Sequence, residues 1–194
     1  MKYINLLYNW TISKAQNPKA KWFLAFVSFI ESSFFPIPPD VILIPMILSN
    51  RNKAWLYSLI CTLSSVLGAV LGYLIGFFFF ETIGTIIIES YNLISDFKNI
   101  KNYYDQYGVW LVLGGGFSPF PYKLITITSG FFNLNFPLFI LVSFVARGAR
   151  FFLIAILLWY YGPKIRLLIE KNLGKFSLLF ILLLILGFTL IKLI

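Results

Sequence analysis

Two short stretches of the sequence, residues 34–40 (FFPIPPD) and 117–123 (FSPFPYK), repeat the pattern Phe-x-Pro-x-Pro, and each interrupts a long apolar run. Proline lacks a backbone N–H and its ring blocks a continuous helix, and the residue before a proline is also biased away from the helical conformation. In hydrocarbon such a break is tolerated only where protein or a watery cavity satisfies the freed backbone groups. Two matching breaks therefore predict two broken hairpins around a site at the middle of a membrane.

The composition is that of an integral membrane protein. Of the 194 residues, 59% are hydrophobic and only 12% are charged, whereas a soluble domain is nearer half apolar and a quarter charged. The 22 phenylalanines and 11 tyrosines are typical of a lipid-exposed body with aromatic belts at its two interfaces. The net charge of +9 comes from basic residues near the hydrophobic boundaries, which favours contact with anionic lipid over nucleic acid.

The hydropathy pattern predicts an all-α membrane domain over residues 22–161. It lies between an N-terminal segment, 1–21, on the cytoplasmic side and a C-terminal part, 162–194, with a basic loop and a last transmembrane helix. In each half of the domain a Pro-kinked re-entrant hairpin precedes a full span, at 54–80 and at 136–161. One span separates the hairpins, so they enter from opposite faces and form two inverted-topology repeats. The expected hairpin breaks are Pro36, Pro38, Pro39, Pro119, Pro121 and Gly116.

Basic residues predict the orientation of these segments. One end of the predicted domain has Arg51 and Lys53, the lysines of the N-terminal segment and the basic cluster at 164–175. The other end has only Lys98, Lys101 and Lys192. Because short cytoplasmic loops carry the excess of Lys and Arg, we expect the first end, and with it the N-terminus, to be cytoplasmic.

Small residues recur every fourth position in the first span, at Ser64, Gly68, Gly72 and Gly76. This spacing produces one smooth ridge along a helix and lets a second helix approach closely. Close helix packing is the main interpretation. A substrate groove, which would supply a lateral opening, is the alternative.

The segment 81–108 predicts an amphipathic helix. Its apolar residues recur at three- and four-residue spacing, and its Asn, Asp and Gln residues lie on the opposite face. We expect this helix to lie in the membrane interface, and packing across the mouth of the protein is the alternative. The apolar face comprises Leu93, Phe97, Ile100, Tyr104 and Tyr107.

Five charged residues fall at predicted membrane depth: Glu31, Asp40, Lys123, Arg147 and Arg150. A charge at the bilayer centre costs about 2.5 to 3.5 kcal/mol on insertion scales, so these groups should be paired or hydrated. The two arginines are three positions apart and share a helix face. Hairpin tips that meet near mid-membrane would bring the two acids against the two arginines, with Lys123 at the second tip.

Two interpretations of this cluster stay open. The first is a purely structural ion network that pins the hairpins. The second is a polar site for a phosphate-bearing headgroup, because arginine presents a planar fork that matches phosphate and helix ends present free amides to anions. In the second case Glu31 is the carboxyl that we expect to exchange a proton during transport.

Enzymatic chemistry is not expected. The chain has no histidine, which removes the commonest acid–base residue. It also lacks a Walker loop and a metal-ligand cluster in its sequence. Cys61 is its single cysteine and fits an apolar filler in a helix. We therefore expect no enzyme, no cofactor and no metal site.

These motifs resemble the DedA family of bacterial membrane proteins, also called the SNARE-associated or VTT domain. Residues 31–40 (ESSFFPIPPD) resemble the acidic, Pro-x-Pro first hairpin of the family. Residues 116–123 (GFSPFPYK), followed by Thr126 and Gly130, resemble its second hairpin, and Arg147 and Arg150 match the basic residues of the helix that follows. The resemblance covers about residues 22–161. The Pro-Pro-Asp and Pro-Tyr-Lys versions resemble the YqaA-like branch.

The resemblance implies a lipid transporter, a flippase or scramblase, of the bacterial plasma (inner) membrane. Its implied cargo is undecaprenyl phosphate or a phospholipid, with protons as the coupling ion, and Glu31, Asp40, Arg147 and Arg150 would inherit the functional roles. An ion or proton antiporter on the same inverted hairpins and a non-transporting scaffold for membrane homeostasis are the alternatives. A homo-oligomer is an arrangement that the sequence leaves open.

Overall fold

The computed structural model describes residues 19–33, 38–90, 94–118 and 121–162, and these residues form helices and short turns, with no strand among them. The helices are α2 (Ala20–Ser33), α3 (Asp40–Ser49), α4 (Ala54–Phe79), α5 (Thr85–Ser90), α6 (Ile94–Phe117) and α7 (Tyr122–Phe131), followed by a helix over Phe136–Gly162. A 3-10 turn, Arg51–Lys53, precedes α4, and a π-helical turn, Phe80–Gly84, follows it. Most of the N-terminal segment, the basic loop, the last predicted span, Pro36 and Pro119 lie outside the described residues.

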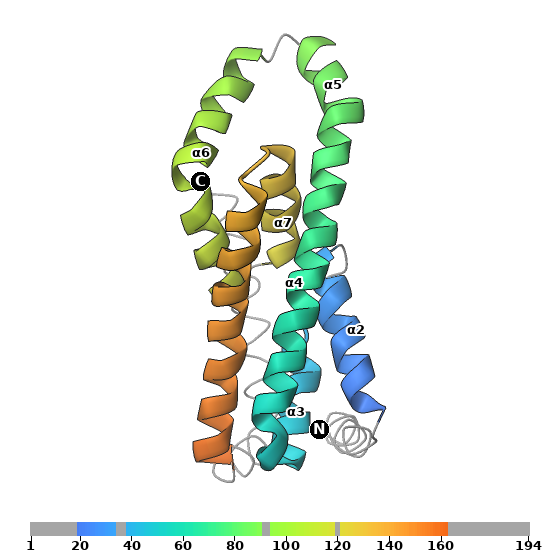
Figure 1. The fold of residues 1–194 in the computed structure, drawn as a ribbon, viewed down its shortest axis with the longest axis vertical. Helices are drawn as coiled ribbons and strands as arrows, with labels where there is room; N and C mark the ends of the chain where they lie inside the picture. Colours follow the sequence, from blue (N-terminus) through green and yellow to red (C-terminus); the bar gives the residue numbers. More distant parts are fainter. Residues whose placement is uncertain (1–18, 34–37, 91–93, 119–120, 163–194) are drawn as a thin grey trace, which may run out of the picture.

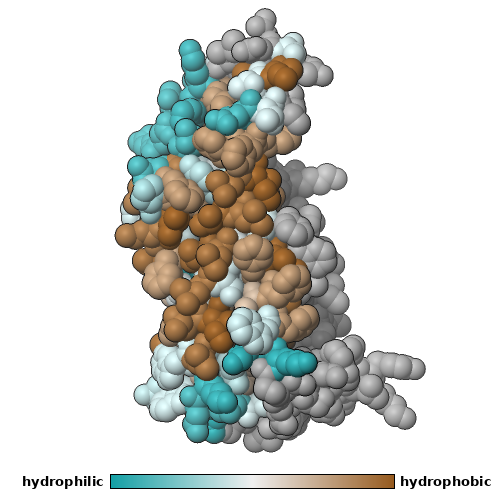
Figure 2. Space-filling view, turned by 45° about the vertical axis from the view of Figure 1, so that its right-hand side comes forward, coloured by the Kyte–Doolittle hydropathy of each residue, from teal (hydrophilic) through white to brown (hydrophobic). Residues whose placement is uncertain are grey.

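Two helices are long and apolar enough to cross a membrane. They extend over Arg51–Thr82, with 32 residues, and over Phe136–Gly162, with 27, whereas about 20 apolar residues suffice for a span. They run side by side along the long axis of the molecule (Figure 1). The visible face carries a broad apolar band between more polar ends (Figure 2). The predicted spans at 54–80 and 136–161 are therefore confirmed as helices of spanning length.

The small-residue ridge of α4 is an interhelical packing surface. The position of a Cβ at Gly68 would lie 2.8 Å from the carbonyl carbon of Phe29 on α2, and one at Gly76 would lie 2.8 Å from the carbonyl carbon of Ile127 on α7. Gly72 faces both Thr126 and the carbonyl oxygen of Ser32. Backbones at this separation leave no room for a side chain. Close packing is thus confirmed, and the alternative of a groove or lateral opening along this ridge is wrong, because α2 and α7 cover it.

The segment after α4 differs from the sequence expectation. No helix ends at Gly108: α6 continues from Ile94 to Phe117 as one helix and descends beside α7 from the top of the molecule (Figure 1). Aromatic packing holds it, since Phe97 stacks on Phe132 and Tyr104 also stacks on Phe132. Ile100 and Tyr107, which share the predicted apolar face, are about half exposed. Residues 94–108 of the predicted amphipathic segment are therefore the upper part of a longer packed helix, whereas residues 81–90 belong to the π-helical turn and α5.

A short polar turn over residues 133–135 joins α7 to the Phe136–Gly162 helix. Asn133 has a positive φ of 56°, a conformation that asparagine tolerates better than most residues. The Asn135 side-chain oxygen accepts a hydrogen bond from the Leu138 amide at 3.0 Å, which caps the new helix. The Tyr73 hydroxyl of α4 donates to the Leu134 carbonyl at 2.6 Å. The turn is thus fixed against α4.

The basic residues of the two ends are separated as predicted. Arg51 Nη1 donates to the Trp159 carbonyl oxygen at 3.3 Å, which places the start of α4 beside the end of the last described helix. At the other end, Lys101 Nζ donates to the Phe132 carbonyl oxygen at 3.0 Å. The two described sets of cations therefore lie at opposite ends of the apolar band.

Candidate functional site

Glu31, Asp40, Arg147 and Arg150 form a polar layer between two apolar clusters. One cluster contains Tyr57 and Cys61 of α4 with Phe151 of the Phe136–Gly162 helix. The other contains Tyr73 of α4 and Phe139 of the same long helix. The two arginines, at positions 147 and 150, lie between these clusters along the chain. The charges thus occur where apolar packing changes from one cluster to the other, near the middle of the long helix.

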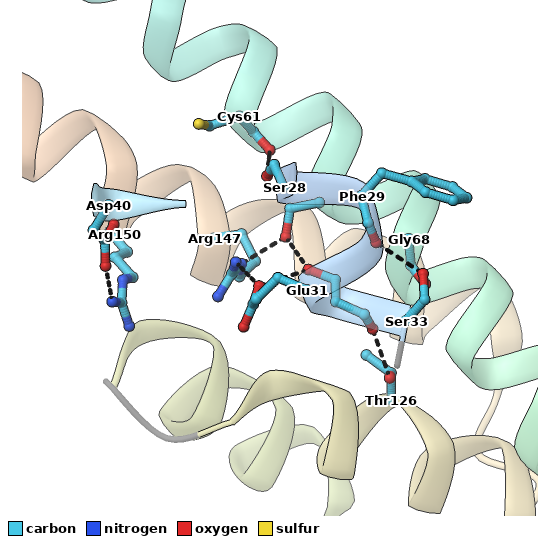
Figure 3. Close-up of polar contacts among 12 residues, drawn as sticks. Ser28, Phe29, Glu31, Ser33, Asp40, Cys61, Gly68, Thr126, Arg147 and Arg150 are labelled. Atoms are coloured by element: carbon cyan, nitrogen blue, oxygen red, sulfur yellow. Dashed lines mark hydrogen bonds and ion pairs between the residues drawn. The ribbon is translucent and has the colours of Figure 1, made fainter. Parts of the chain in front are cut away.

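Arg147 and Glu31 form a buried ion pair. Arg147 Nη2 donates to Glu31 Oε2 at 2.6 Å, and the side chains are 2% and 10% exposed. Arg147 Nε also donates to Ser65 Oγ at 2.6 Å. The hydroxyls of Ser65 and Ser32 are hydrogen-bonded to each other at 2.7 Å. Ser32 Oγ in turn donates to Glu31 Oε2 at 3.1 Å. These four side chains close a ring of hydrogen bonds between α2, α4 and the long helix. Figure 3 shows the pair at the centre of the site.

Aromatic rings pack against the Arg147 guanidinium. Its central carbon lies 5.0 Å from the centre of the Tyr122 ring and 4.8 Å from that of Phe151, within the range of cation–π attraction. The Tyr122 hydroxyl in turn donates to Ser143 Oγ at 2.7 Å. The first residue of α7 is thereby fastened to the helix that carries Arg147.

Arg150 and Asp40 form a second, more open ion pair. Arg150 Nη2 donates to Asp40 Oδ2, and Nη1 donates to the carbonyl oxygen of Ser118. The two side chains are 16% and 18% exposed. The other carboxylate oxygen, Asp40 Oδ1, is buried and has no hydrogen-bond partner among the described residues. In Figure 3 this pair lies to one side of the Glu31–Arg147 pair.

The proline clusters position these groups by ending and restarting helices. Pro39 immediately precedes α3, whose first residue is Asp40. Pro121 immediately precedes α7, whose first residue is Tyr122. Pro38, Pro39 and Pro121 therefore lie between helices, as predicted. Each break ends in a helix N-terminus, where the helix dipole stabilises a negative charge.

The prediction that Gly116 forms part of a hairpin break is wrong. Gly116 lies inside α6, one residue before the helix ends. A Cβ at this position would lie 2.7 Å from Cβ of Ala146 on the neighbouring helix. Gly116 thus allows α6 to approach the long helix closely.

Of the five predicted site residues, the structure joins four in two pairs. The predicted pairing of the two acids with the two arginines is confirmed. Lys123 lies half-buried in the first turn of α7, and its backbone carbonyl accepts a hydrogen bond from the Thr126 hydroxyl at 2.9 Å.

The sequence reasoning missed the hydroxyl groups of the site. Beyond Ser32 and Ser65, the Ser33 hydroxyl donates to the Gly68 carbonyl at 3.0 Å, and the Thr126 hydroxyl donates to the Ser32 carbonyl at 3.0 Å. The sequence does contain a signal for these bonds, because small hydroxyl residues recur inside its otherwise apolar helices. Such residues commonly form hydrogen bonds between helices in membranes. Further members of this buried set are Ser28, whose hydroxyl donates to the Cys61 carbonyl, and Ser58, whose hydroxyl donates to that of Phe151.

Comparison with known proteins identifies the family. Residues 36–160 match the VTT domain. The chain belongs to the VTT domain (DedA) family. An uncharacterized protein of Haemophilus influenzae is 36% identical over 172 residues, which cover 89% of each chain. A Histophilus somni protein named as a homologue of HI0703 is 34% identical over 164 residues, 84% of this chain and 85% of its own.

No solved structure matches the chain. The family, together with the two helices of spanning length, makes this VTT-domain protein a membrane protein. Asp40, Arg147 and Arg150 lie inside the matched range, whereas Glu31 lies five residues before it.

Proposed function

We propose that this VTT-domain protein moves a phosphate-headed lipid, such as undecaprenyl phosphate or a phospholipid, between the leaflets of the bacterial plasma (inner) membrane. The observation that carries the proposal is the Asp40–Arg150 pair, a partly exposed arginine at the middle of an apolar helix beside a helix break. Ionisable groups inside a membrane are expensive and are retained for function or for pairing. An arginine that remains partly accessible at this depth fits recognition of a phosphate.

The proposal includes a membrane topology. We take α2 and α3 as one re-entrant hairpin and the lower part of α6 with α7 as the other, related as inverted repeats. In support, α2 and α3 both pack on α4, and α7 begins near mid-molecule and runs toward the end opposite to that of α3 (Figure 1). The N-terminus and the Arg51 end are cytoplasmic in this arrangement, in agreement with the distribution of basic residues.

The lipid tails remain in the bilayer and the headgroup passes the polar layer. The protein supplies no covalent chemistry in this scheme, so it is not an enzyme and needs no cofactor. Protons are the proposed coupling ion, because the site contains two carboxyl groups, those of Glu31 and Asp40, and carboxyl groups inside a membrane commonly belong to proton relays.

The test is leaflet-resolved lipid movement in proteoliposomes that contain the purified protein. Fluorescent phosphatidic acid in one leaflet is followed by quenching from outside. Arg150→Gln should slow its movement at least about tenfold, the effect of losing roughly 1.4 kcal/mol of headgroup binding. Lys53→Gln, which removes an exposed cation at the end of the molecule, should transport at the wild-type rate.

The same vesicles separate the alternatives. Movement of ions without lipid identifies an antiporter on this scaffold. Absence of both lipid and ion movement in the wild-type protein would leave only the role of a scaffold. Equal lipid movement in wild type and Arg150→Gln would reject Arg150 as the headgroup ligand.

A further inference from the structure

The two ion pairs of the site differ in the hydrogen bonding of their carboxylate oxygens. The Glu31 carboxylate oxygen Oε2 accepts from both Arg147 and Ser32. Asp40 has one oxygen bonded to Arg150 and a second, buried oxygen without a partner among the described residues. A buried polar atom without a hydrogen bond is expensive, so the Asp40–Arg150 pair lies in an environment that is incompletely matched to a carboxylate.

Arg147 cannot receive a ligand without dismantling the core. Its side chain is 2% exposed, and its guanidinium donates to Glu31 and Ser65 and has the rings of Tyr122 and Phe151 packed against it. Removal of Glu31 from this position would leave a buried, unpaired charge. Arg147 therefore acts as a fixed structural partner that holds α2 against the long helix.

Arg150 is different in each of these respects. Its side chain is 16% exposed, and its two bonds to described residues go to the first residue of α3 and to a backbone carbonyl just after α6. A guanidinium has five N–H donors in a planar fork. The arginine thus keeps donor capacity, and its anionic partner sits at the end of an element rather than within a packed ring.

From this asymmetry we infer that Asp40 occupies the position of a phosphate group at Arg150 and is displaced when a phosphate binds. The inference rests on the proposed function and specifies its ligand arginine. A phosphate offers oxygens that a guanidinium can bind in the same bidentate manner as a carboxylate. The displaced Asp40 carboxylate stays at the N-terminus of α3, where the helix dipole stabilises its charge.

Competition by Asp40 and simple electrostatics both predict tighter phosphate binding when a negative charge is removed. Only competition requires that the charge removed is the one on Asp40. If Asp40 occupies Arg150 in about nine molecules of ten, the apparent phosphate affinity is roughly tenfold below the intrinsic one. Asp40→Asn removes the competing charge and keeps the side-chain size. It should therefore bind phosphate about tenfold more tightly than the wild type.

The experiment measures equilibrium binding to the full chain in detergent, with short-chain phosphatidic acid and with inorganic phosphate as separate probes. Tighter binding of phosphatidic acid alone identifies a lipid headgroup as the ligand, and tighter binding of both probes identifies the phosphate group itself. Asp105→Asn is the matched control, since it removes the same charge from an exposed pair with Lys101 and should leave affinity unchanged. Arg150→Gln should abolish the gain when it is combined with Asp40→Asn.

The outcomes separate this inference from the proposed function. Equal or weaker binding by folded Asp40→Asn, with a wild-type protein that still binds and moves lipid, overturns displacement and leaves lipid transport standing. The same gain in Asp105→Asn also overturns it, because the effect would then be one of net charge. A wild-type protein that neither binds nor moves phosphatidic acid overturns both. Asp40→Ala, which removes the carboxyl group altogether, repeats the test if Asp40→Asn does not fold.

Discussion

Arg147 and Glu31 are 116 positions apart in the sequence, and Arg147 Nη2 donates to Glu31 Oε2 at 2.6 Å inside the protein. The bond connects the long second span to α2, and two serines complete a closed ring around it. The pair links the two halves of the chain through their charges as well as through apolar packing.

A double-mutant cycle on this pair should show strong coupling. Glu31→Leu leaves the Arg147 guanidinium buried without its counter-ion, and we expect the free energy of unfolding in detergent to fall by about 3–5 kcal/mol. Adding Arg147→Met should restore most of this loss, because replacing both members of a buried pair with apolar groups is often neutral. Chemical denaturation of the two single variants and the double variant measures the coupling. A double variant no more stable than Glu31→Leu would contradict it.

Substitution of the α4 ridge should separate helices. Gly68→Ala would place a methyl group against the Phe29 carbonyl of α2, and such overpacking destabilises by about 1–3 kcal/mol. Gly114→Ala is the control, because a Cβ at this helical position meets nothing within 4 Å and alanine is the better helix former. Thermal unfolding in detergent should show a lower midpoint for Gly68→Ala and an unchanged or higher one for Gly114→Ala. Equal midpoints would refute the close-approach assignment.

The Thr126 hydroxyl should contribute through a single bond between α7 and α2. Thr126→Val keeps the shape of the side chain and leaves the buried Ser32 carbonyl without this donor, which should lower the free energy of unfolding by about 1–3 kcal/mol. Thr82→Val provides the comparison, since Thr82 is exposed and, within the described part of the chain, its hydroxyl bonds to carbonyl groups of its own helix alone. We expect a change within about 0.5 kcal/mol there. A similar loss of unfolding free energy in both variants would show that the bond to Ser32 stabilises the protein no more than the local bonds of Thr82 do.

The proposed proton coupling can be tested for each of the two carboxyl groups. The sequence predicts Glu31, whereas the geometry favours Asp40, because Asp40 is the more exposed acid and its arginine partner is the more accessible one. Lipid movement in proteoliposomes with and without an imposed proton gradient should lose its gradient dependence in Asp40→Asn and keep it in Glu31→Gln. The reverse pattern would return the role to Glu31, and dependence in both variants would exclude either acid as the single coupling group.

Local chain chemistry determined much of this protein. Apolar runs of spanning length predicted the two long helices, proline chemistry predicted the breaks at Pro38, Pro39 and Pro121, and the expense of intramembrane charge predicted that Glu31 and Asp40 would meet two arginines. These inferences succeed because backbone restriction and desolvation depend on the residue itself and on its immediate neighbours.

Tertiary packing decided the rest. Gly108 does not end a helix, because α6 packs against α7 on both sides of it, and Gly116 serves close approach to Ala146 rather than a break. Which acid would pair with which arginine, and which pair would remain partly exposed, depended on where α2 and α3 dock on α4 and the long helix. Charge and hydropathy along a chain do not encode that docking, since it is set by the fit of side chains from distant segments.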